Sequence, residues 1–396
     1  MRICLVSETW SPDINGVAHT LGHLAVELRA RGCRLQLIRP QPARSPGESP
    51  PDTATRPTRT AGMEAELQVR PVAVPGYREV RIGMPATRRI TRLWREQRPD
   101  VIYLATQGPL GWSALRAARR MAIPVVTGWH TNFDHYCRDY GVAWLAPFVT
   151  RRLRTFHNRG AATLVPTHQQ ATELGAKGFE NLRVMARGIE GERYSPAFRD
   201  TALRRQWGAD EHRPVALYVG RLAAEKNLTL LRDTLLAMQA ARPDLVLVVV
   251  GDGPGRRALQ QALPSAHFTG FIDRQDLIRH YASADLFIFP SLSETWGNVV
   301  LEAMASGLAV VAFRHAAGAE LIDHDSHGLC LPVDDPDGFR DAAVTLCQQP
   351  ARYARLGRAA RQRALHYTWP AITDDFVSAL VHARENANET ARTCRI

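Results

Sequence analysis

Two carboxylates near the C-terminal third of the chain, Glu294 and Glu302, enclose an uncharged stretch in "SLSETWGNVVLEAMASG". The apolar run "DLFIFPS" before them predicts a buried strand, and the residues after it predict a helix. In open α/β sheets, ligands bind where the carboxyl end of a strand meets a helix N-terminus. There the backbone N–H groups of Asn298, Val299 and Val300 would donate to a phosphate. Glu294 would accept hydrogen bonds from neutral hydroxyls, and Glu302 would do the same for a ribose.

A simpler interpretation of these residues stays open. Ser291 and Glu294 have the spacing of a helix capping box, and Glu302 would then be a salt-bridged helix residue. The occurrence of both carboxylates in one strand–loop–helix segment favours a binding site over this interpretation.

Two cations follow another predicted strand, in "YVGRLAAEKNL". Arg221 and Lys226 share one loop at the carboxyl end of that strand, which suits a diphosphate. The chain contains only two lysines, Lys177 and Lys226, against many arginines. A lysine kept in such a chain indicates a need for a compact point charge. The alternative is a solvated loop in which Glu225 pairs with Lys226.

The N-terminal half offers two further candidates. The polar loop in "SETWSPDINGVAHTL" precedes a predicted helix, and Gly16 would let the backbone approach a phosphate. A plain loop with Asn15-Gly16 as a turn is the alternative. In "GWHTNFDHYCRDYG", His130 lies at the carboxyl end of a predicted strand, so a role in a site is favoured over a structural role. His135 and Tyr136 are expected to pack or cap only.

Two other patterns carry less weight. The glycines of "VVVGDGPGRRAL" miss the dinucleotide pattern G-x-G-x-x-G, so they predict a tight strand-to-helix turn. The acidic triplets at 323–325 and 335–337 resemble the D-x-D motif that binds metal in another class of transferases. Neither follows an apolar strand, so we expect turns there and no essential metal.

These residues need a framework, and short apolar strands alternate with helices along the whole chain. This alternation predicts α/β structure with parallel sheets covered on both faces. The pattern breaks around 190–205 and then restarts. We therefore expect two doubly wound, Rossmann-like domains of similar size, at 1–190 and 191–368, facing across a cleft. A final helix and tail at 369–396 would pack toward the first domain. The polar segment 42–62 is expected to be a loop.

Composition agrees with an ordinary globular protein. Of 396 residues, 45% are hydrophobic and 22% are charged. The six cysteines are scattered without a C-x-x-C pair, which argues against a zinc site or a disulfide framework and suits a reducing cytosol. The N-terminus shows no signal-peptide pattern and no apolar run long enough to span a membrane, so we expect a cytoplasmic protein.

Together, "VGRLAAEKN", "VGDGP", "FPSLSETWGNVVLEAMASG" and the "NGV" loop resemble glycosyltransferase family 4, over nearly the whole length. The resemblance implies the GT-B fold and a retaining transferase that uses a nucleotide-sugar donor without a metal cofactor. It also implies roles for the candidates. Arg221 and Lys226 would hold the diphosphate, Glu294 the donor sugar and Glu302 the ribose. Gly16 would face the phosphates and His130 the sugar.

A finer resemblance is to the branch containing GDP-mannose-dependent α-mannosyltransferases and diacylglycerol glycosyltransferases. It implies transfer of a hexose, with mannose from GDP-mannose one candidate, to a lipid or glycan acceptor. UDP-sugar-dependent glycosylation of diacylglycerol is the alternative. A nucleotide-sugar epimerase on the same fold and a binding protein without activity also stay open; the intact set of four charged residues disfavours the latter.

The charge is uneven. Residues 1–200 hold 29 Lys and Arg against 17 Asp and Glu, whereas residues 201–396 hold 21 against 22. Part of this excess falls in "RIGMPATRRITRLWREQRPD", a predicted helix with five arginines (Arg88, Arg89, Arg92, Arg95 and Arg98) beside an apolar stripe (Ile90, Leu93 and Trp94). We expect this surface to rest on an anionic membrane at its inner face; a sheet-covering helix with a solvated basic side is the alternative. No motif supports nucleic-acid binding.

Overall fold

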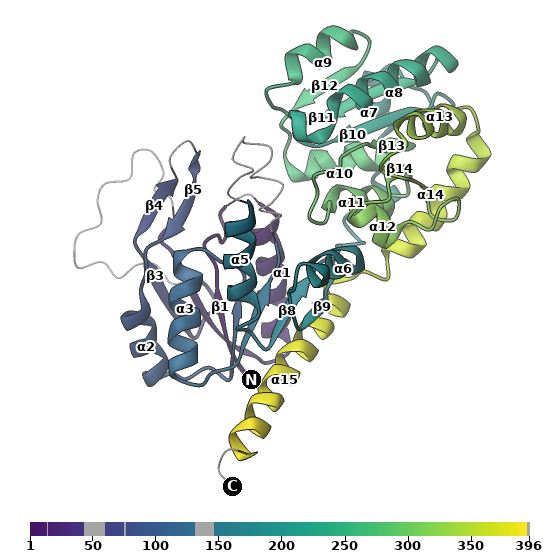
Figure 1. The fold of residues 1–396 in the computed structure, drawn as a ribbon. Helices are drawn as coiled ribbons and strands as arrows, with labels where there is room; N and C mark the ends of the chain where they lie inside the picture. The colour runs from purple at the N-terminus through teal and green to yellow at the C-terminus, as the bar shows by residue number, and fades with distance from the viewer. Residues whose placement is uncertain (14, 43–59, 75–76, 131–145, 394–396) are drawn as a thin grey trace, which may run out of the picture. The chain divides into compact units, whose positions relative to one another are not determined.

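The computed structural model describes residues 1–13, 15–42, 60–74, 77–130 and 146–393 (Figure 1). The chain divides into two compact units. Unit 1 comprises Met1–Pro166, Gln170–Met185 and Ile372–Ile396, and unit 2 comprises Thr167–Gln169 and Ala186–Ala371. Most of the loop expected at 42–62 lies outside the described residues. His135 and Tyr136 lie outside them as well.

Unit 1 is built on a parallel sheet of seven strands in the order β3-β2-β1-β6-β7-β8-β9. The strands are β1 (Arg2–Val6), β2 (Arg34–Pro40), β3 (Ala65–Val69), β6 (Val101–Leu104), β7 (Val125–Gly128), β8 (Ala162–Val165) and β9 (Leu182–Val184). A separate antiparallel hairpin joins β4 (Pro71–Val74) to β5 (Tyr77–Gly83). The helices are α1 (Gly16–Ala30), α2 (Thr87–Glu96), α3 (Pro109–Arg120), α5 (Ala146–His157), α6 (His168–Ala176) and α15 (Trp369–Thr393).

Alternate residues of the central strands point to opposite faces of this sheet, so each face has its own core. One core joins Cys4 and Val6 of β1 to buried residues of α2, α3 and α5, including Trp94 and Phe156. On the other face, Tyr103 of β6 packs edge-to-face against Phe376 of α15, with ring centroids 4.8 Å apart. The end of the chain therefore belongs to unit 1, as the expected fold required.

The basic helix is α2, and its apolar residues are not available to a membrane. Ile90 and Trp94 are fully buried against the sheet. The arginines on its outer side, Arg88, Arg89, Arg92 and Arg95, are exposed. The helix ends at Glu96, so the expectation that Arg98 belongs to it is wrong. Arg98 instead donates to the carbonyl oxygen of Ala122 at 3.1 Å.

Unit 2 contains a parallel sheet of six strands in the order β12-β11-β10-β13-β14-β15. The strands are β10 (Val215–Val219), β11 (Val246–Val250), β12 (His267–Gly270), β13 (Leu286–Phe289), β14 (Ala309–Phe313) and β15 (Leu329–Leu331). Its helices are α7 (Thr201–Gln206), α8 (Leu228–Ala241), α9 (Arg256–Ala262), α10 (Arg274–Ser283), α11 (Asn298–Ala305), α12 (Ala317–Leu321), α13 (Pro336–Cys347) and α14 (Pro350–Ala364). The central strands β10, β11, β13 and β14 are buried throughout, as expected for parallel strands covered on both faces.

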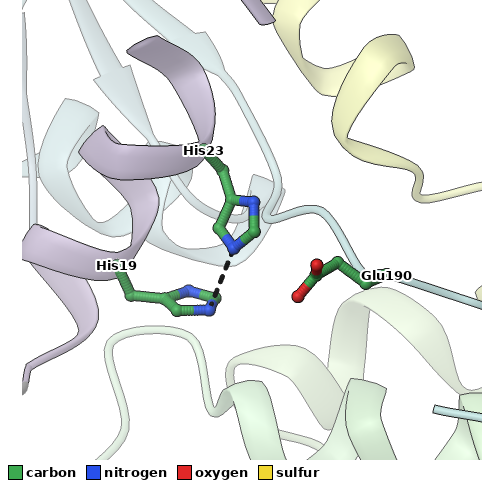
Figure 2. A group of neighbouring side chains, drawn as sticks. All are labelled: His19, His23 and Glu190. Atoms are coloured by element: carbon green, nitrogen blue, oxygen red, sulfur yellow. Dashed lines mark hydrogen bonds between the residues drawn. The ribbon is translucent and has the colours of Figure 1, made fainter. Parts of the chain in front are cut away.

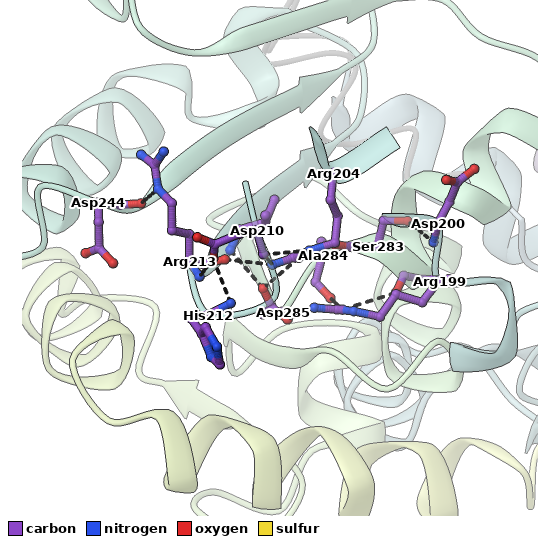
Figure 3. A network of polar contacts seen from close by, with 12 residues as sticks. Arg199, Asp200, Arg204, Asp210, His212, Arg213, Asp244, Ser283, Ala284 and Asp285 are labelled. Carbon is purple, nitrogen blue, oxygen red and sulfur yellow. Dashed lines mark hydrogen bonds and ion pairs between the residues drawn. The ribbon is translucent and has the colours of Figure 1, made fainter. Parts of the chain in front are cut away.

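A buried arginine closes the amino-terminal edge of this sheet (Figure 3). Arg204 of α7 donates to the carbonyl oxygens of Asp210, Arg213 and Ser283, at 2.7 Å for the shortest bond to each. It also donates to the carboxylate of Asp285 at 3.1 Å, and that carboxylate accepts from the N–H of Val215 at 2.9 Å. Since a buried guanidinium is tolerated only when its donors are satisfied, this network fixes where β10 and β13 begin.

Candidate functional site

The strand order of unit 2 reverses between β10 and β13, the two central strands. At such a reversal the loops leaving the two strands diverge, and the carboxyl ends of the strands are open to a ligand. The loop after β10 carries Arg221 and Lys226, and the loop after β13 carries Glu294. The amide of Asn227 ties the loops together by donating to the carbonyl oxygen of Pro290 at 3.3 Å.

Lys226 and Glu294 form an ion pair across this point. The Lys226 Nζ atom lies 2.5 Å from the Glu294 Oε1 atom, and both side chains are mostly buried. The same carboxylate oxygen accepts from the Ser291 hydroxyl at 3.0 Å. Lys226 Nζ also lies 3.5 Å from the Ser293 hydroxyl. The structure thus brings together a cation and a carboxylate that are 68 residues apart in the chain.

The alternatives for these two residues are wrong in detail. Glu225 pairs with Arg221, at 3.4 Å, and Lys226 pairs with Glu294 instead. Arg221 is 59% exposed, so this pair is a weak surface contact. Ser291 does not cap a helix, because α11 begins at Asn298 with Gly297 as its N-cap.

The start of α11 lies close to this pair in sequence. The N–H of Val300 is already used, since it donates to the carbonyl oxygen of Gly297 at 3.0 Å. Within the described residues, the N–H groups of Asn298 and Val299 have no protein acceptor. These two groups therefore fit the expectation of a phosphate at the helix N-terminus better than Val300 does.

Glu302 lies on α11 in a pocket of hydroxyl donors. Its carboxylate accepts from the Tyr281 hydroxyl at 3.0 Å, and the Tyr194 hydroxyl lies nearby. Burial raises the pKa of Glu302, while the Tyr281 bond, the nearby Arg274 guanidinium and Tyr194 oppose the rise. The salt-bridge alternative is not what the structure shows, because the direct contacts of Glu302 are tyrosines. A carboxylate that already accepts from phenols can accept from ribose hydroxyls in the same way.

The glycine-rich turn after β11 lets the loops pack closely. Gly251 has a φ of 133°, and a Cβ there would lie 2.0 Å from the carbonyl oxygen of Gly220. Only glycine fits such an approach. The tight strand-to-helix turn predicted from sequence is therefore confirmed, and it supports the loop that carries Arg221 and Lys226.

In unit 1, Gly16 is the first residue of α1. The Asn15 side chain caps this helix, accepting from the N–H groups of Val17 and Ala18. Two histidines that the sequence interpretation did not single out follow on the same helix, with the Nε2 atoms of His19 and His23 3.2 Å apart (Figure 2). Their spacing of four residues was the available signal, because residues i and i+4 share a helix face.

His130 follows β7, and its position is set by its neighbours within unit 1. Its Nε2 atom lies 2.9 Å from the Tyr103 hydroxyl. Gly128 makes this possible, because a Cβ there would lie 2.1 Å from the Tyr103 hydroxyl and 2.6 Å from His130 Nε2. Tyr103 is in turn packed against Phe376 of α15. The expected location at a strand end is confirmed, but the tyrosine that orients the imidazole was not predicted.

Glu8 is a further residue that sequence reasoning missed. It follows β1, and its own N–H donates to the Thr106 hydroxyl after β6 at 2.8 Å. One carboxylate oxygen accepts from the N–H of Gly83, and the other from the N–H of Leu110 at 3.0 Å. Burial raises the pKa of Glu8 to about 7, and these backbone bonds oppose the rise. No local sequence signal marks it, because its donors lie 75 and 102 residues away.

The two acidic triplets have structural roles, as expected for turns. Asp335 caps α13 by accepting from the N–H of Gly338 at 2.8 Å. Asp325 has a φ of 59° and pairs with Arg352 at 2.9 Å. Three tryptophans, Trp10, Trp129 and Trp296, are buried. Among the described residues, no helix is both long and apolar enough to cross a membrane.

Comparison with known proteins gives consistent matches along the chain. Residues 14–193 match the model for Glycosyltransferase Family 4, and residues 213–349 match the model for Glycosyl transferases group 1. A GDP-mannose-dependent alpha-mannosyltransferase of Mycolicibacterium smegmatis is 34% identical over 377 residues, covering 95% of this chain and 96% of the relative. Sulfoquinovosyl transferase SQD2 of Arabidopsis thaliana is 32% identical over 308 residues, covering 76% of this chain and 60% of the relative.

Among solved structures, Anabaena HepE in complex with UDP has a TM-score of 0.73 at 19% identity, covering 96% of this chain and all of the other. A sucrose-phosphate synthase from Thermosynechococcus elongatus has a TM-score of 0.70 at 18% identity, covering 95% and 97%. At this identity the likeness concerns the fold. It confirms the expected GT-B architecture, an α/β chain with two Rossmann-like halves.

Proposed function

Since this chain belongs to glycosyltransferase family 4, we propose that it is a retaining hexosyltransferase that uses a nucleotide-sugar donor. The observation that carries this proposal is the Lys226–Glu294 pair at the reversal of the unit 2 sheet, next to the N-terminus of α11. GDP-mannose is the donor we favour, because three relatives that this chain matches over 86–96% of their length are GDP-mannose-dependent alpha-mannosyltransferases. The relatives named above are transferases by name, which favours transfer over epimerisation.

The charges in unit 2 suit the donor as follows. The diphosphate would take Lys226 away from Glu294, with Arg221 as a second, more exposed cation. The N–H groups of Asn298 and Val299 would donate to the same diphosphate. Glu294, released from Lys226 but still held by Ser291, would accept from hydroxyls of the sugar. Glu302 would accept from the ribose.

Catalysis would then rest on charge stabilisation and positioning. The leaving diphosphate carries the developing negative charge, which Lys226 and the helix N-terminus stabilise more strongly as the bond breaks. We propose that the acceptor attacks the face from which the diphosphate departs, and that the departing phosphate helps to remove its proton. This gives retention of configuration. For unit 1 we propose that Gly16 approaches a phosphate and that His130, oriented by Tyr103, contacts the sugar.

A donor panel tests the proposal directly. Thermal stability is measured with GDP-mannose, UDP-glucose and UDP-glucuronate, since a ligand at a hundredfold its Kd adds about 2.7 kcal/mol to apparent stability. GDP-mannose should stabilise most. A preference for UDP-glucose would favour the diacylglycerol-glycosylating alternative, and no response to any of the three would contradict the proposal.

The lysines provide a matched pair of variants. Lys226→Ala should weaken donor binding roughly 10- to 100-fold, because a charge-assisted hydrogen bond contributes about 1.5–3 kcal/mol. Lys177→Ala removes the other lysine of the chain, at an exposed position, and should bind like the wild type. Equal affinity of the two variants would refute the diphosphate role of Lys226.

For the acceptor we propose a lipid or lipid-linked molecule at an anionic membrane surface. The support is the exposed basic side of α2; because its apolar residues are buried, contact would be electrostatic and reversible. Vesicle co-sedimentation at low and high salt checks this. Arg88→Ser, Arg89→Ser and Arg92→Ser combined should reduce binding to anionic vesicles. Equal binding to neutral vesicles would favour a soluble acceptor.

A further inference from the structure

A second basic surface lies on unit 1, in a groove between α3 and the residues that follow α5. The groove has a volume of about 400 Å³ and is lined by Trp112, Leu115, Arg116, Arg119, Arg120 and Arg159. Its lining contains four cationic side chains and no carboxylate. Most lining residues lie in the carboxyl-terminal two-thirds of α3, which runs from the carboxyl end of β6 back toward the start of β7. The groove is therefore at the sheet edge opposite to Glu8 and His130.

Trp112 organises the floor of this groove. Its ring packs against Phe156 of the core, with centroids 5.2 Å apart. The guanidinium of Arg152 lies 4.8 Å from the ring centroid, and that of Arg159 lies 5.8 Å from it. Cation–π contact at these distances holds both charges beside the groove.

The four lining arginines and the neighbouring Arg152 form a cluster of exposed cationic side chains. In the part of the chain that the structure describes, no carboxylate forms an ion pair with any of the five (Arg116, Arg119, Arg120, Arg152 and Arg159). Helix C-termini favour cations, which accounts for Arg119 and Arg120 in the last turn of α3. It does not account for Arg116, one turn earlier, or for Arg152 in the middle of α5. Like charges gathered in this way repel unless an anion joins them.

We propose that this groove binds the phosphate of an anionic lipid headgroup, preferably a phosphomonoester. Guanidinium groups bind phosphate oxygens through paired hydrogen bonds, and several can share one phosphate. A lipid is favoured over a soluble phosphate because α2, α3 and α5 cover the same face of the unit 1 sheet, so the groove and the exposed arginines of α2 lie on one side of unit 1 (Figure 1). The inference extends the membrane part of the proposed function, and it makes no use of the donor.

The experiment measures vesicle binding of the full chain without any donor. Vesicles containing phosphatidic acid are compared with vesicles containing phosphatidylglycerol, matched in surface potential. A diffuse basic surface responds to potential alone, whereas a phosphate site distinguishes the headgroups. The wild type should bind the phosphatidic acid vesicles about tenfold more tightly, the effect of one charge-assisted hydrogen bond.

Three triple variants separate the groove from its surroundings. Arg116→Ser, Arg119→Ser and Arg120→Ser combined should abolish the headgroup preference. The same change at Arg88, Arg89 and Arg92 of α2 should weaken binding to both vesicles and keep the preference. Replacing the three groove arginines by lysine preserves the charge but removes the paired donors, so the preference should fall while binding to phosphatidylglycerol stays unchanged. Unfolding temperatures of all variants confirm that they fold.

Two kinds of result would overturn the proposal. Equal binding of the wild type to the two matched vesicles, or a preference that survives the groove variant, refutes the site. Tight binding of glycerol phosphate in solution, with loss of vesicle binding, shows a soluble phosphate ligand and refutes the lipid assignment. If none of the nucleotide sugars stabilised the protein, these vesicle results could still be interpreted, because none of them depends on nucleotide-sugar binding.

Discussion

The two sheets share one strand order around their central strands but place different chemistry at the point where it reverses. In unit 1 this point lies between β1 and β6 and holds Glu8. In unit 2 it lies between β10 and β13 and holds Lys226 paired with Glu294. Both carboxylates follow a central strand, yet one is bound by neutral backbone N–H groups and the other by a cation.

This difference decides what each carboxylate can do. The donors to Glu8 belong to the hairpin strand β5 and to the start of α3, so releasing them would disrupt the framework of unit 1. The partner of Glu294 is the end of a flexible side chain, which a phosphate can take over at small structural cost. A backbone clamp thus makes a structural carboxylate, and an exchangeable ion pair makes one available to a ligand.

The largest expected effect tests the clamp. The pKa of Glu8 is about 7 in the folded protein against 4.5 for the free side chain. As pH rises from 4.5, the unfolded chain loses the proton first, so the free energy of unfolding falls until about pH 7 and then levels. The total is about 3 kcal/mol, at 1.36 kcal/mol per pKa unit.

Glu8→Gln removes this titration and serves as the reference. Hydrogen exchange of amides in β1 and α3, measured between pH 5 and pH 8 and corrected for intrinsic rates, should show the loss of protection in the wild type only. Amides of β10 provide an internal control in unit 2. The same pH profile in the wild type and in Glu8→Gln would mean that the backbone bonds outweigh burial.

The next effect tests the exchangeable pair. Glu294→Gln keeps the acceptor oxygen for Lys226 and Ser291 but removes the charge that would bind sugar hydroxyls. Turnover should fall roughly 10- to 100-fold, from a loss of about 1.5–3 kcal/mol. Affinity for the bare nucleoside diphosphate should hardly change. Glu302→Gln should instead weaken the bare nucleotide, and the opposite pattern would show that the two roles are exchanged.

A smaller effect separates the two cations of the same loop. Arg221 is exposed and already paired with Glu225, whereas Lys226 is mostly buried beside Glu294. Arg221→Ala should therefore weaken donor binding by about 1 kcal/mol or less, the usual worth of an exposed ion pair. Titration calorimetry of Arg221→Ala beside Lys226→Ala measures this. A larger loss for Arg221→Ala would mean that the donor reorders the loop.

The sequence identified the residues at the strand-order reversal of unit 2 better than those at the reversal of unit 1, and the reason is physical. The strands β10 and β13 are continuous apolar runs, so Lys226 and Glu294 could each be placed at the carboxyl end of a strand, although their ion pair was not predicted. Glu8 depends on backbone donors, which any residue can supply. The same holds for Tyr103, which contacts His130 after β7 and Phe376 of α15, both far from it in the chain.

Periodicity also could not decide what covers an apolar stripe. Ile90 and Trp94 have the spacing of a membrane-facing stripe and of a core-facing stripe alike. Only the packing of α2 against the sheet shows that they belong to the core. The basic side, which sequence did identify, remains exposed.

The smallest expected effect concerns metal ions, and it follows from the charges at the unit 2 point. A metal-dependent transferase neutralises the leaving diphosphate with a divalent cation held by carboxylates. Here Lys226 and the N-terminus of α11 would supply that positive charge, and Asp325 and Asp335 are already engaged with Arg352 and with the N–H of Gly338. Incubation with EDTA should therefore leave the transfer rate within about twofold of the untreated enzyme. Measuring the rate with EDTA, and again after adding excess Mg²⁺, checks this. A complete loss of the transfer rate that Mg²⁺ restores would show that Lys226 does not suffice to neutralise the diphosphate. The exchangeable Lys226–Glu294 pair would then no longer explain how unit 2 binds the donor.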